Sequence, residues 1–350
     1  MTNWRQLLAC PACRGGLAPD FTCSACGASY PVRDGAPRLM LETGLTQTGL
    51  TPETAARVET VRRFYEAAPF PGYPPNDSLS WLRRRAARSR FAALLEEAIP
   101  GDARVLEIGC GTGQMCLYLA RADRLVVGAD VTAASIDLAA AAARRFGVEQ
   151  AHFIQTDLHR PGLREAAFDV VYCSGVLHHT PDPQAAFGRI VRLAKPGGMI
   201  VVGLYNSLAR IPLRLRRAAG RLSGYRWIPG DPVLRDRAAE PARREAWLRD
   251  QYQHPEEHRH TVAEVQTWFR VAEVDYVRSF PSTLLAEDGE PALFAPAADD
   301  WGFEAWLAQL GWMRSLGGEG GLFVMVGRRR GGEPRRRPVA LDAATAQISA

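Results

Sequence analysis

The sequence predicts an α/β fold with a mostly parallel sheet, preceded by a small metal-binding segment. Short apolar stretches alternate with stretches of helical periodicity from residue 105 to residue 205, and their spacing leaves room for a crossover helix between successive strands. Parallel strands joined in this way form a sheet that is covered on both faces. Two Cys-x-x-Cys pairs within the first 26 residues predict the metal-binding segment.

The composition indicates the cellular compartment of the protein more clearly than its binding partner. The chain has 350 residues, 47% of them apolar, so it can bury a full core. It contains no run of about 18 apolar residues and no signal-peptide core, so we expect a soluble, cytoplasmic protein without a transmembrane segment. The formal net charge of +5 is carried almost wholly by arginine, since Lys195 is the only lysine, which suggests a coding bias as much as a nucleic-acid surface.

The first 42 residues are predicted to form a zinc ribbon. Cys10, Cys13, Cys23 and Cys26 make two knuckles in a segment rich in glycine and proline. Four thiolates from two such turns suit tetrahedral Zn²⁺, and so small a segment needs a metal to hold it. A closed four-sulfur site has no open position for substrate, so its role is structural or a docking surface. Unligated or redox-active thiols are the alternative, which the absence of a strand and helix around either knuckle disfavours.

The segment between the ribbon and the sheet is expected to be a linker, residues 43–57, followed by a helical lid segment, residues 58–100. Residues 81–99 are interpreted as one amphipathic helix with an arginine-rich first half. That arginine run is either an RNA-binding surface or a solvated helix face, and the second interpretation is favoured.

A glycine-rich turn after the first strand of the sheet is the organising motif. Glu107 lies at the end of this strand, and Gly109, Gly111 and Gly113 follow at every second position. Glycine lets backbone approach a ligand closely, which points to a nucleoside. The pyrophosphate fingerprint Gly-x-Gly-x-x-Gly is not met, because Gln114 follows the third glycine. A dinucleotide site or a purely structural turn remains the alternative.

Two acids end the next two strands. Asp130 closes the stretch 124–130, and Asp157 lies at the tip of the stretch 153–158. A carboxylate at the carboxyl edge of the sheet can accept both hydroxyls of a ribose, as in the dinucleotide folds. For each acid the alternative is a helix cap; Thr132 is expected to cap the alanine-rich helix 133–146.

These motifs together resemble the class I S-adenosylmethionine (SAM) methyltransferases. Glu-x-Gly-x-Gly-x-Gly is similar to their motif I, and residues 105–210 look like one subgroup through Gly175-Val176-Leu177-His178-His179 and Leu204-Tyr205-Asn206-Ser207. The resemblance implies a Rossmann-like, seven-stranded, mostly parallel sheet over residues 101–328 and SAM as cofactor. The cofactor-binding residues that it implies are Glu107, Gly109, Gly111, Gly113, Asp130, Asp157, Leu158 and Ser174, with Asp157 as the acid that contacts adenine.

The N-terminal segments carry resemblances of their own. The ribbon is similar to the small zinc-ribbon proteins that activate methyltransferases by binding them, and a comparable ribbon begins some rRNA guanine methyltransferases. The string Phe64-Tyr65-Glu66-Ala67-Ala68-Pro69 resembles a segment that folds over the cofactor in the same subgroup. Tyr65 and Tyr73 are therefore lid candidates, with plain packing of the rings as the alternative.

The rest of the chain is expected to complete the sheet and cover its edge. Residues 273–277 and 321–327 are the sixth and seventh strands, and insertions at about 211–260 and 281–320 interrupt this part. The first insertion is interpreted as substrate cover. The basic tail, residues 329–350, lacks apolar periodicity and is expected to be disordered, with contact to nucleic acid or acidic partners as the less favoured role.

The predicted activity is methyl transfer to an O, N or C nucleophile of a small-molecule or lipid-like acceptor. A sulfonium leaving group is already activated, so the enzyme mainly orients the reactants and excludes water. Candidates for a base are His178, His179 and Tyr205, with Tyr252 and His254 weaker; at most one of the two adjacent histidines should face the pocket. One alternative is an RNA (rRNA or tRNA) methyltransferase that grips phosphates through its ribbon and basic segments. Another is a non-catalytic, zinc-bearing interaction protein.

Overall fold

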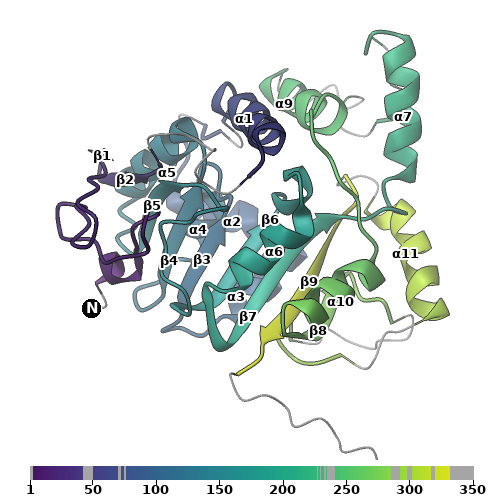
Figure 1. Ribbon diagram of the computed structural model, residues 1–350. Coiled ribbons are helices and arrows are strands. Elements are labelled where there is room, and N and C mark those ends of the chain that lie inside the picture. Colours follow the sequence, from purple (N-terminus) through teal and green to yellow (C-terminus); the bar gives the residue numbers. More distant parts are fainter. Residues whose placement is uncertain are drawn as a thin grey trace, which may run out of the picture.

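A nine-stranded sheet organises the molecule in the computed structural model (Figure 1). Its strand order is β1-β2-β5-β4-β3-β6-β7-β9-β8. The strands are β1 (Val32–Arg33), β2 (Ala36–Leu39), β3 (Arg104–Ile108), β4 (Leu125–Asp130), β5 (Ala151–Thr156), β6 (Phe168–Ser174), β7 (Ala194–Tyr205), β8 (Val274–Phe280) and β9 (Leu322–Arg329). The structure describes residues 3–41, 50–69, 72–74, 76–226, 228, 230, 231, 234, 241–284, 292–297, 302–316 and 320–331.

Seven of these strands form the sheet that the sequence predicts. From β5 to β7 all neighbours are parallel, and only β9 runs antiparallel, between β7 and β8. The predicted Rossmann-like, seven-stranded, mostly parallel α/β sheet is therefore confirmed. The order reverses beside β3, where the chain goes first to β4 and later to β6 on the other side. This is the edge position at which open α/β sheets bind ligands.

Helices cover both faces of the sheet, as parallel crossovers require. Successive side chains of one strand enter different cores: Leu106 and Ile108 pack with α6 and α10, whereas Val105 packs with the helices α2 to α5. The helices are η1 (Trp4–Leu7), α1 (Pro52–Glu66), α2 (Leu79–Ala86), α3 (Arg90–Ala98), α4 (Gln114–Leu119), α5 (Ala133–Phe146), η3 (Leu177–His179), α6 (Pro183–Val191), α7 (Ile211–Leu222), α9 (Pro241–Tyr252), α10 (Val262–Val271) and α11 (Phe303–Ser315). Within the described ranges, no helix has the length and apolar content that crossing a bilayer requires.

The ribbon joins the main sheet instead of standing apart from it. Strand β2 pairs in parallel with β5, so that Leu39 lies opposite Thr156, and β1 extends the sheet by one more strand. Leu39 is fully buried and packs on the backbone at Gly162, where a Cβ atom would come within 2.6 Å of its side chain. The fold thus keeps a small residue where the ribbon meets the segment that connects β5 to β6.

Three local predictions need correction. The expected helix over 81–99 is two helices, α2 and α3, because Ser89 accepts a hydrogen bond from Ala92 and caps the second one. Helix α1 begins at Pro52, inside the stretch expected to be linker, with Thr51 as its N-cap. Residues 42–49 lie outside the described part of the chain. The tail from residue 332 onward also lies outside it, while Arg329 still belongs to β9.

Candidate functional site

The glycine turn after β3 has the backbone form that only glycine adopts easily. Gly109, Gly111 and Gly113 all have φ between +51° and +80°. A Cβ atom on Gly109 would lie 2.1 Å from Val176, and one on Gly113 would lie 2.5 Å from Phe153. The two outer glycines are therefore required by packing as well as by conformation. Gly113 is the N-cap of α4. A side chain at this position would point into the core, against Phe153, and not toward a ligand.

Asp130 holds this turn in place. Its Oδ2 accepts a hydrogen bond from the Gly111 N–H at 2.9 Å, and its Oδ1 accepts from the N–H and the hydroxyl of Thr132 at 2.9 and 2.7 Å. The side chain is buried, and burial raises its pKa. Each carboxylate oxygen has about two acceptor positions. Oδ2 therefore keeps one position for a ligand beyond its bond to Gly111.

Thr132 does not cap α5 as predicted, because its hydroxyl donates to Asp130. The cap comes from Glu66 at the end of α1: its two carboxylate oxygens accept from the N–H groups of Ala133 and Ala134, each at 3.0 Å. Glu66 thus fixes the last turn of α1 over the edge of the sheet. Glu66 therefore ties the segment that resembles a lid to the first turn of α5, just after the strand that ends in Asp130.

Asp157 offers an acceptor atom without a partner. Its Oδ1 accepts from the His159 N–H at 2.8 Å and faces the ring nitrogen Nδ1 of the same residue at 2.8 Å. Its Oδ2 is buried and has no hydrogen-bond partner. An unsatisfied buried acceptor is costly unless a ligand supplies a donor. Asp157 is therefore the strand-tip acid most open to a ligand.

One cavity of about 520 Å³ joins these features. It is bounded by the carboxyl ends of β3, β4, β5 and β6 and is covered by α1, α2 and α3. The predicted residues that line it are Glu107, Gly109, Gly111, Asp130, Asp157, Leu158, Ser174, His179 and Tyr205. Gly113 and His178 do not line it, and neither do the weaker candidates Tyr252 and His254. Glu107 is buried beside the turn, accepts from the Cys116 thiol at 2.8 Å, and has its pKa raised to about 8 by burial.

The two lid candidates have different positions. Tyr65 lines the cavity, and its hydroxyl donates to the Asp250 carboxylate of α9 at 3.1 Å. Tyr73 lies outside the cavity; its hydroxyl donates to the Thr112 carbonyl at 2.7 Å, within the glycine turn. Tyr65 thus closes the cavity, while Tyr73 braces the turn beneath it.

His179 lines the cavity beyond β6, and β4 and β3 separate that strand from β5, which Asp157 follows. Its Nδ1 is 2.7 Å from the carbonyl oxygen of Glu256, which can only accept, so Nδ1 carries the proton and Nε2 does not. Its ring stacks on His254 with centroids 3.7 Å apart. Burial lowers the pKa of His179 to about 4, so the ring is neutral at pH 7. This is the state in which an imidazole accepts a proton.

His178 differs from its neighbour. It is fully buried outside the cavity, and its ring centre lies 3.8 Å from that of Tyr205. Neither of its ring nitrogens has a hydrogen-bond partner. Burial lowers its pKa well below the ordinary value. Only one of the two adjacent histidines faces the cavity, in line with the expectation that at most one would.

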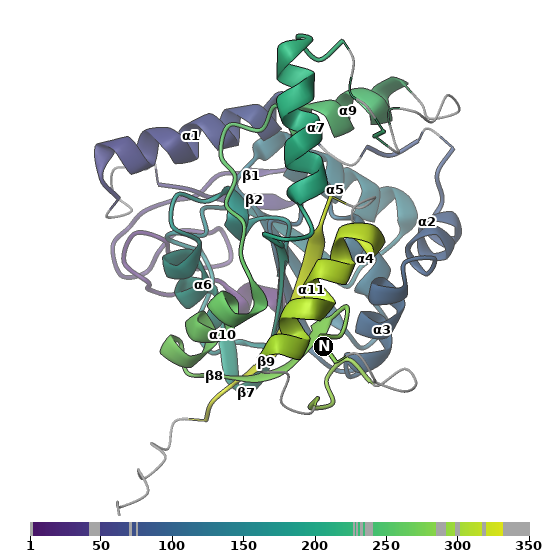
Figure 2. The same cartoon turned by 90° about the vertical axis from the view of Figure 1, so that its right-hand side faces the viewer.

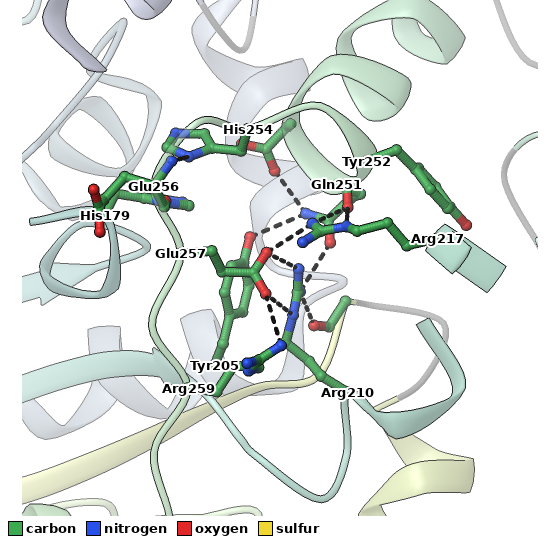
Figure 3. Close-up of polar contacts among 12 residues, drawn as sticks. His179, Tyr205, Arg210, Arg217, Gln251, Tyr252, His254, Glu256, Glu257 and Arg259 are labelled. Carbon is green, nitrogen blue, oxygen red and sulfur yellow. Dashed lines mark hydrogen bonds and ion pairs between the residues drawn. The ribbon is translucent and has the colours of Figure 1, made fainter. Parts of the chain in front are cut away.

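Tyr205 is held by a buried network that Figure 3 shows. The Arg210 guanidinium lies 3.5 Å from the centre of the Tyr205 ring and binds the Glu257 carboxylate at 2.7 and 3.2 Å. Gln251 donates to the Tyr205 hydroxyl at 3.0 Å and accepts from Arg210 at 3.0 Å. Burial alone would raise the pKa of Glu257, but the charges of Arg210 and Arg217 outweigh it and lower that pKa.

Sequence reasoning missed most of this network. It named Tyr205, and it named Tyr252 and His254 as weaker candidates, but it gave no role to Arg210, Gln251 or Glu257. Tyr252 donates to Asp231 at 2.6 Å and supports α9 without lining the cavity. The only signal was the length of the insertion after the fifth strand, which predicted cover without saying which residues provide it.

The four ribbon cysteines come together as predicted. Their sulfur atoms all lie within 4.8 Å of one another, with 3.7 Å between Cys10 and Cys26 and 3.4 Å between Cys13 and Cys23. Sulfur atoms bound to one tetrahedral zinc ion are about 3.8 Å apart, given Zn–S bonds of about 2.3 Å. The Tyr30 hydroxyl lies 3.0 Å from the Cys10 sulfur, as a partner of a metal-bound thiolate would.

Comparison with known proteins supports the reading of the sheet. The family model described as the methyltransferase domain matches residues 106–202, which run from β3 to β7 and contain the glycine turn and both strand-tip acids. The central sheet has the methyltransferase fold. The match covers the part of the chain that carries the predicted cofactor residues, and it excludes the ribbon and both insertions.

Individual relatives are more distant. An uncharacterized protein of Synechococcus sp. (syc1184_c) is 26% identical over 238 residues, which cover 60% of this chain and 57% of that protein. The ubiquinone biosynthesis O-methyltransferase of Xanthomonas axonopodis pv. citri is 30% identical over 152 residues, 43% of this chain and 62% of that enzyme. A solved structure of the Haloferax volcanii Trm112 methyltransferase activator in complex with a methyltransferase aligns with a TM-score of 0.45 and 17% identity, covering 72% of this chain and 93% of that chain. The chain spans about half the length of the curated relatives it matches.

Proposed function

We propose that the protein is a SAM-dependent methyltransferase that acts on an O, N or C nucleophile of a small-molecule or lipid-like acceptor. The observation that carries the proposal is the single cavity that has a glycine turn and two strand-tip acids at one end and a neutral histidine at the other. A cofactor and an acceptor can therefore meet inside one cavity. Methyl transfer between them needs alignment and exclusion of water more than chemical assistance.

The residues at the strand tips fit SAM better than a dinucleotide. The unpartnered Oδ2 of Asp157 can accept from the exocyclic amine of adenine, and the remaining acceptor position on Asp130 can take a ribose hydroxyl. The turn at Gly109 and Gly111 lets the methionine part lie against the backbone. Two buried carboxylates at this edge would repel a pyrophosphate. SAM, when bound, supplies a methyl group on a positively charged sulfur.

His179 is the residue best placed to take a proton from the acceptor. Its Nδ1–H donates to the Glu256 carbonyl, and this bond leaves Nε2 as the basic nitrogen. Its lowered pKa keeps it unprotonated at pH 7 but also makes it a weak base. It can therefore take the proton of a hydroxyl or amine acceptor once the arriving methyl group has made that proton strongly acidic. Tyr205, fixed by Arg210 and Gln251, orients the acceptor from the neighbouring strand. Tyr65 and α1 exclude water.

Isothermal titration with SAM, S-adenosylhomocysteine and NAD tests the cofactor. We expect both adenosyl compounds to bind in the micromolar range and NAD to give no heat. Binding of NAD without SAM would overturn the proposal, and no heat from any of the three would favour the non-catalytic interaction protein. Labelled methyl transfer into cell extract, fractionated into small molecules, lipid, RNA and protein, then identifies the acceptor class.

An RNA substrate has less support from the arginine run. Arg83 donates to the Ala120 carbonyl, and Arg85 binds Asp77 and Gln114, so both are committed to packing α2 on the domain. Label in the RNA fraction, together with RNA affinity that falls steeply with salt, would favour the RNA methyltransferase instead.

We also propose that the ribbon holds a structural zinc ion through Cys10, Cys13, Cys23 and Cys26. The closeness of the four sulfur atoms and the absence of any other donor type among them support it. One zinc ion per chain by metal analysis is the expected result. Such a site has no open position, so its effect on the reaction would be indirect.

A further inference from the structure

Helix α7 projects from the body of the protein (Figure 2). On its inner side Leu213 and Gly220 are buried, and Arg217 binds Glu257 at 2.7 Å. The backbone at Gly220 lies against Tyr225 and Ile228. These contacts fix the helix to the acceptor end of the cavity and leave its other side uncovered by the described residues.

The outer side of α7 combines exposed leucine with exposed arginine. Leu215 is 69% exposed and Leu222 is 93% exposed, and the exposed Ala218 lies between them. Leu215 and Leu222 are two helical turns apart, so they lie on one stripe of the helix. Arg214 and Arg221, also exposed and also two turns apart, run beside this stripe. Single exposed leucines are normal on a protein surface, whereas apolar side chains grouped on one strip mark an interaction surface.

The charged residues of α7 and of the chain on either side of it all have one sign. Residues 183–230 contain no aspartate or glutamate, and the part from residue 211 to residue 230 carries five arginines. Helices with apolar residues on one strip and arginines beside it lie in the interface of anionic membranes, where the apolar side chains enter the acyl region and the cations meet phosphates.

We propose that the outer side of α7 docks on an anionic lipid bilayer, with Leu215, Ala218 and Leu222 inserted and Arg214 and Arg221 at the headgroup phosphates. A nucleic acid would use the arginines but would leave the leucines in water. A bilayer engages both. The docking does not depend on the proposed methyl transfer, although it would place the acceptor end of the cavity, through Arg217 and Glu257, close to a lipid-like acceptor.

A second group of exposed apolar side chains provides a sharp internal comparison. On α11, Phe303, Trp306 and Leu307 are 72%, 47% and 37% exposed, and the two aromatic rings stack on each other. The acidic Glu304 lies in the same helical turn, so this group does not combine apolar with cationic character. If exposed apolar surface alone caused lipid binding, this group would contribute at least as much as α7.

Flotation of the full-length protein with vesicles tests the proposal. Vesicles of phosphatidylcholine with about one-third phosphatidylglycerol are compared with pure phosphatidylcholine, at low salt and at about 1 M salt. We expect binding to the anionic vesicles only, and weaker binding at high salt. The double variant Leu215→Glu/Leu222→Glu should lower the bound fraction at least tenfold, and Arg214→Glu/Arg221→Glu should do the same.

Two matched controls separate the helix from the rest of the surface. Leu138→Glu changes a leucine on α5 that is 42% exposed, and Trp306→Glu changes the exposed group on α11. Both should keep wild-type flotation, and all variants should keep the wild-type thermal midpoint because every altered side chain is at the surface. Two results would overturn the proposal. One is that the wild type does not float with anionic vesicles. The other is that Trp306→Glu loses binding while Leu215→Glu/Leu222→Glu keeps it. Equal heat on titration with SAM in all variants shows that the cofactor site is unaffected.

Discussion

The two ends of the cavity are built in different ways. The end proposed for SAM consists of backbone turns and acids at the tips of three adjacent strands, β3, β4 and β5, whose register the sheet itself fixes. The end proposed for the acceptor is lined by His179, by Tyr205 of β7 and by Asp250 of α9. A polar network of Arg210, Glu257 and Gln251 supports it from behind. The first is set by strand pairing, and the second by a polar network.

This difference has a physical consequence. Strand tips are placed by many backbone hydrogen bonds, so the cofactor end tolerates change in side chains that do not touch the ligand. A buried polar network holds only while every member is satisfied, because an unpaired buried charge is costly. The acceptor end should therefore be the more fragile of the two, and it is also the end that can change substrate by changing a few side chains.

The largest expected effect comes from the ribbon, which braces the cofactor end. Around the first knuckle, Ala9 donates to the Gly162 carbonyl, Arg14 donates to the carbonyls of Pro161 and Leu163, and Arg160 donates to Ala12. Cys10→Ser should release zinc and weaken SAM binding, because the segment after Asp157 loses its support. Apparent free energies of zinc binding to structural sites are about 10 kcal/mol, so the loss of stability should exceed that of any other substitution.

Metal analysis and SAM titration measure both parts of this prediction. Ser24→Ala is the matched control, because Ser24 lies inside the second knuckle but is not a metal ligand. This variant should keep one zinc ion per chain. Full zinc occupancy in Cys10→Ser would refute the ligand assignment. Lost zinc with unchanged SAM affinity would show that the ribbon does not brace the cofactor end.

At the acceptor end, Arg210→Met should cost about 3 kcal/mol of unfolding free energy, because it leaves the buried Glu257 with fewer partners. SAM affinity should change less than about twofold, since no strand-tip acid is touched. The double variant Arg210→Met/Glu257→Gln should lose less than the two single losses added together. Urea unfolding gives the free energies. A strong drop in SAM affinity in Arg210→Met would remove the distinction between the two ends.

Asp157→Asn tests the cofactor end with the smallest change of shape. An asparagine amide has one oxygen and one NH₂ group. If the oxygen keeps the bond to the His159 N–H, the NH₂ group, a donor, replaces the unpartnered Oδ2. If the amide turns over instead, the bond to His159 is lost. The lost charged acceptor should lower SAM affinity about 30-fold, which is about 2 kcal/mol. Stability should be nearly unchanged. Asp130→Ala would weaken SAM binding too, but it also frees Gly111 and Thr132, so it is the less specific test.

The predictability of the two ends follows the same division. The glycine turn, Asp130 and Asp157 are close to strands whose apolar pattern is plain in the sequence, so their meeting at one edge could be predicted. Arg210, Gln251 and Glu257 come from an irregular insertion, where no periodicity tells which side chains face each other. Glu66 as the cap of α5 could not be predicted either, because a cap from a distant helix leaves no local signal. The addition of β1 and β2 to the sheet was missed for a similar reason, since it depends on pairing between Leu39 and Thr156 across the fold.

The smallest expected effect is the pH dependence of stability caused by His179. In the folded protein its pKa is lowered to about 4, whereas in the unfolded chain it is near 6.5. Between these values the unfolded chain binds the proton and the folded one does not, so stability is lost as the pH falls from about 6.5 toward 4. At pH 5 this contribution is about 2 kcal/mol. In His179→Gln, which can still donate to Glu256, the loss of stability between pH 7.5 and pH 5 should be smaller by that amount.

Urea unfolding at both pH values measures this difference in the free energy of unfolding. The control is His258→Gln, which changes a partly exposed histidine of the same region. An unchanged pH dependence in His179→Gln would mean that folding does not lower the pKa of His179, which contradicts a buried imidazole that stays neutral down to about pH 4.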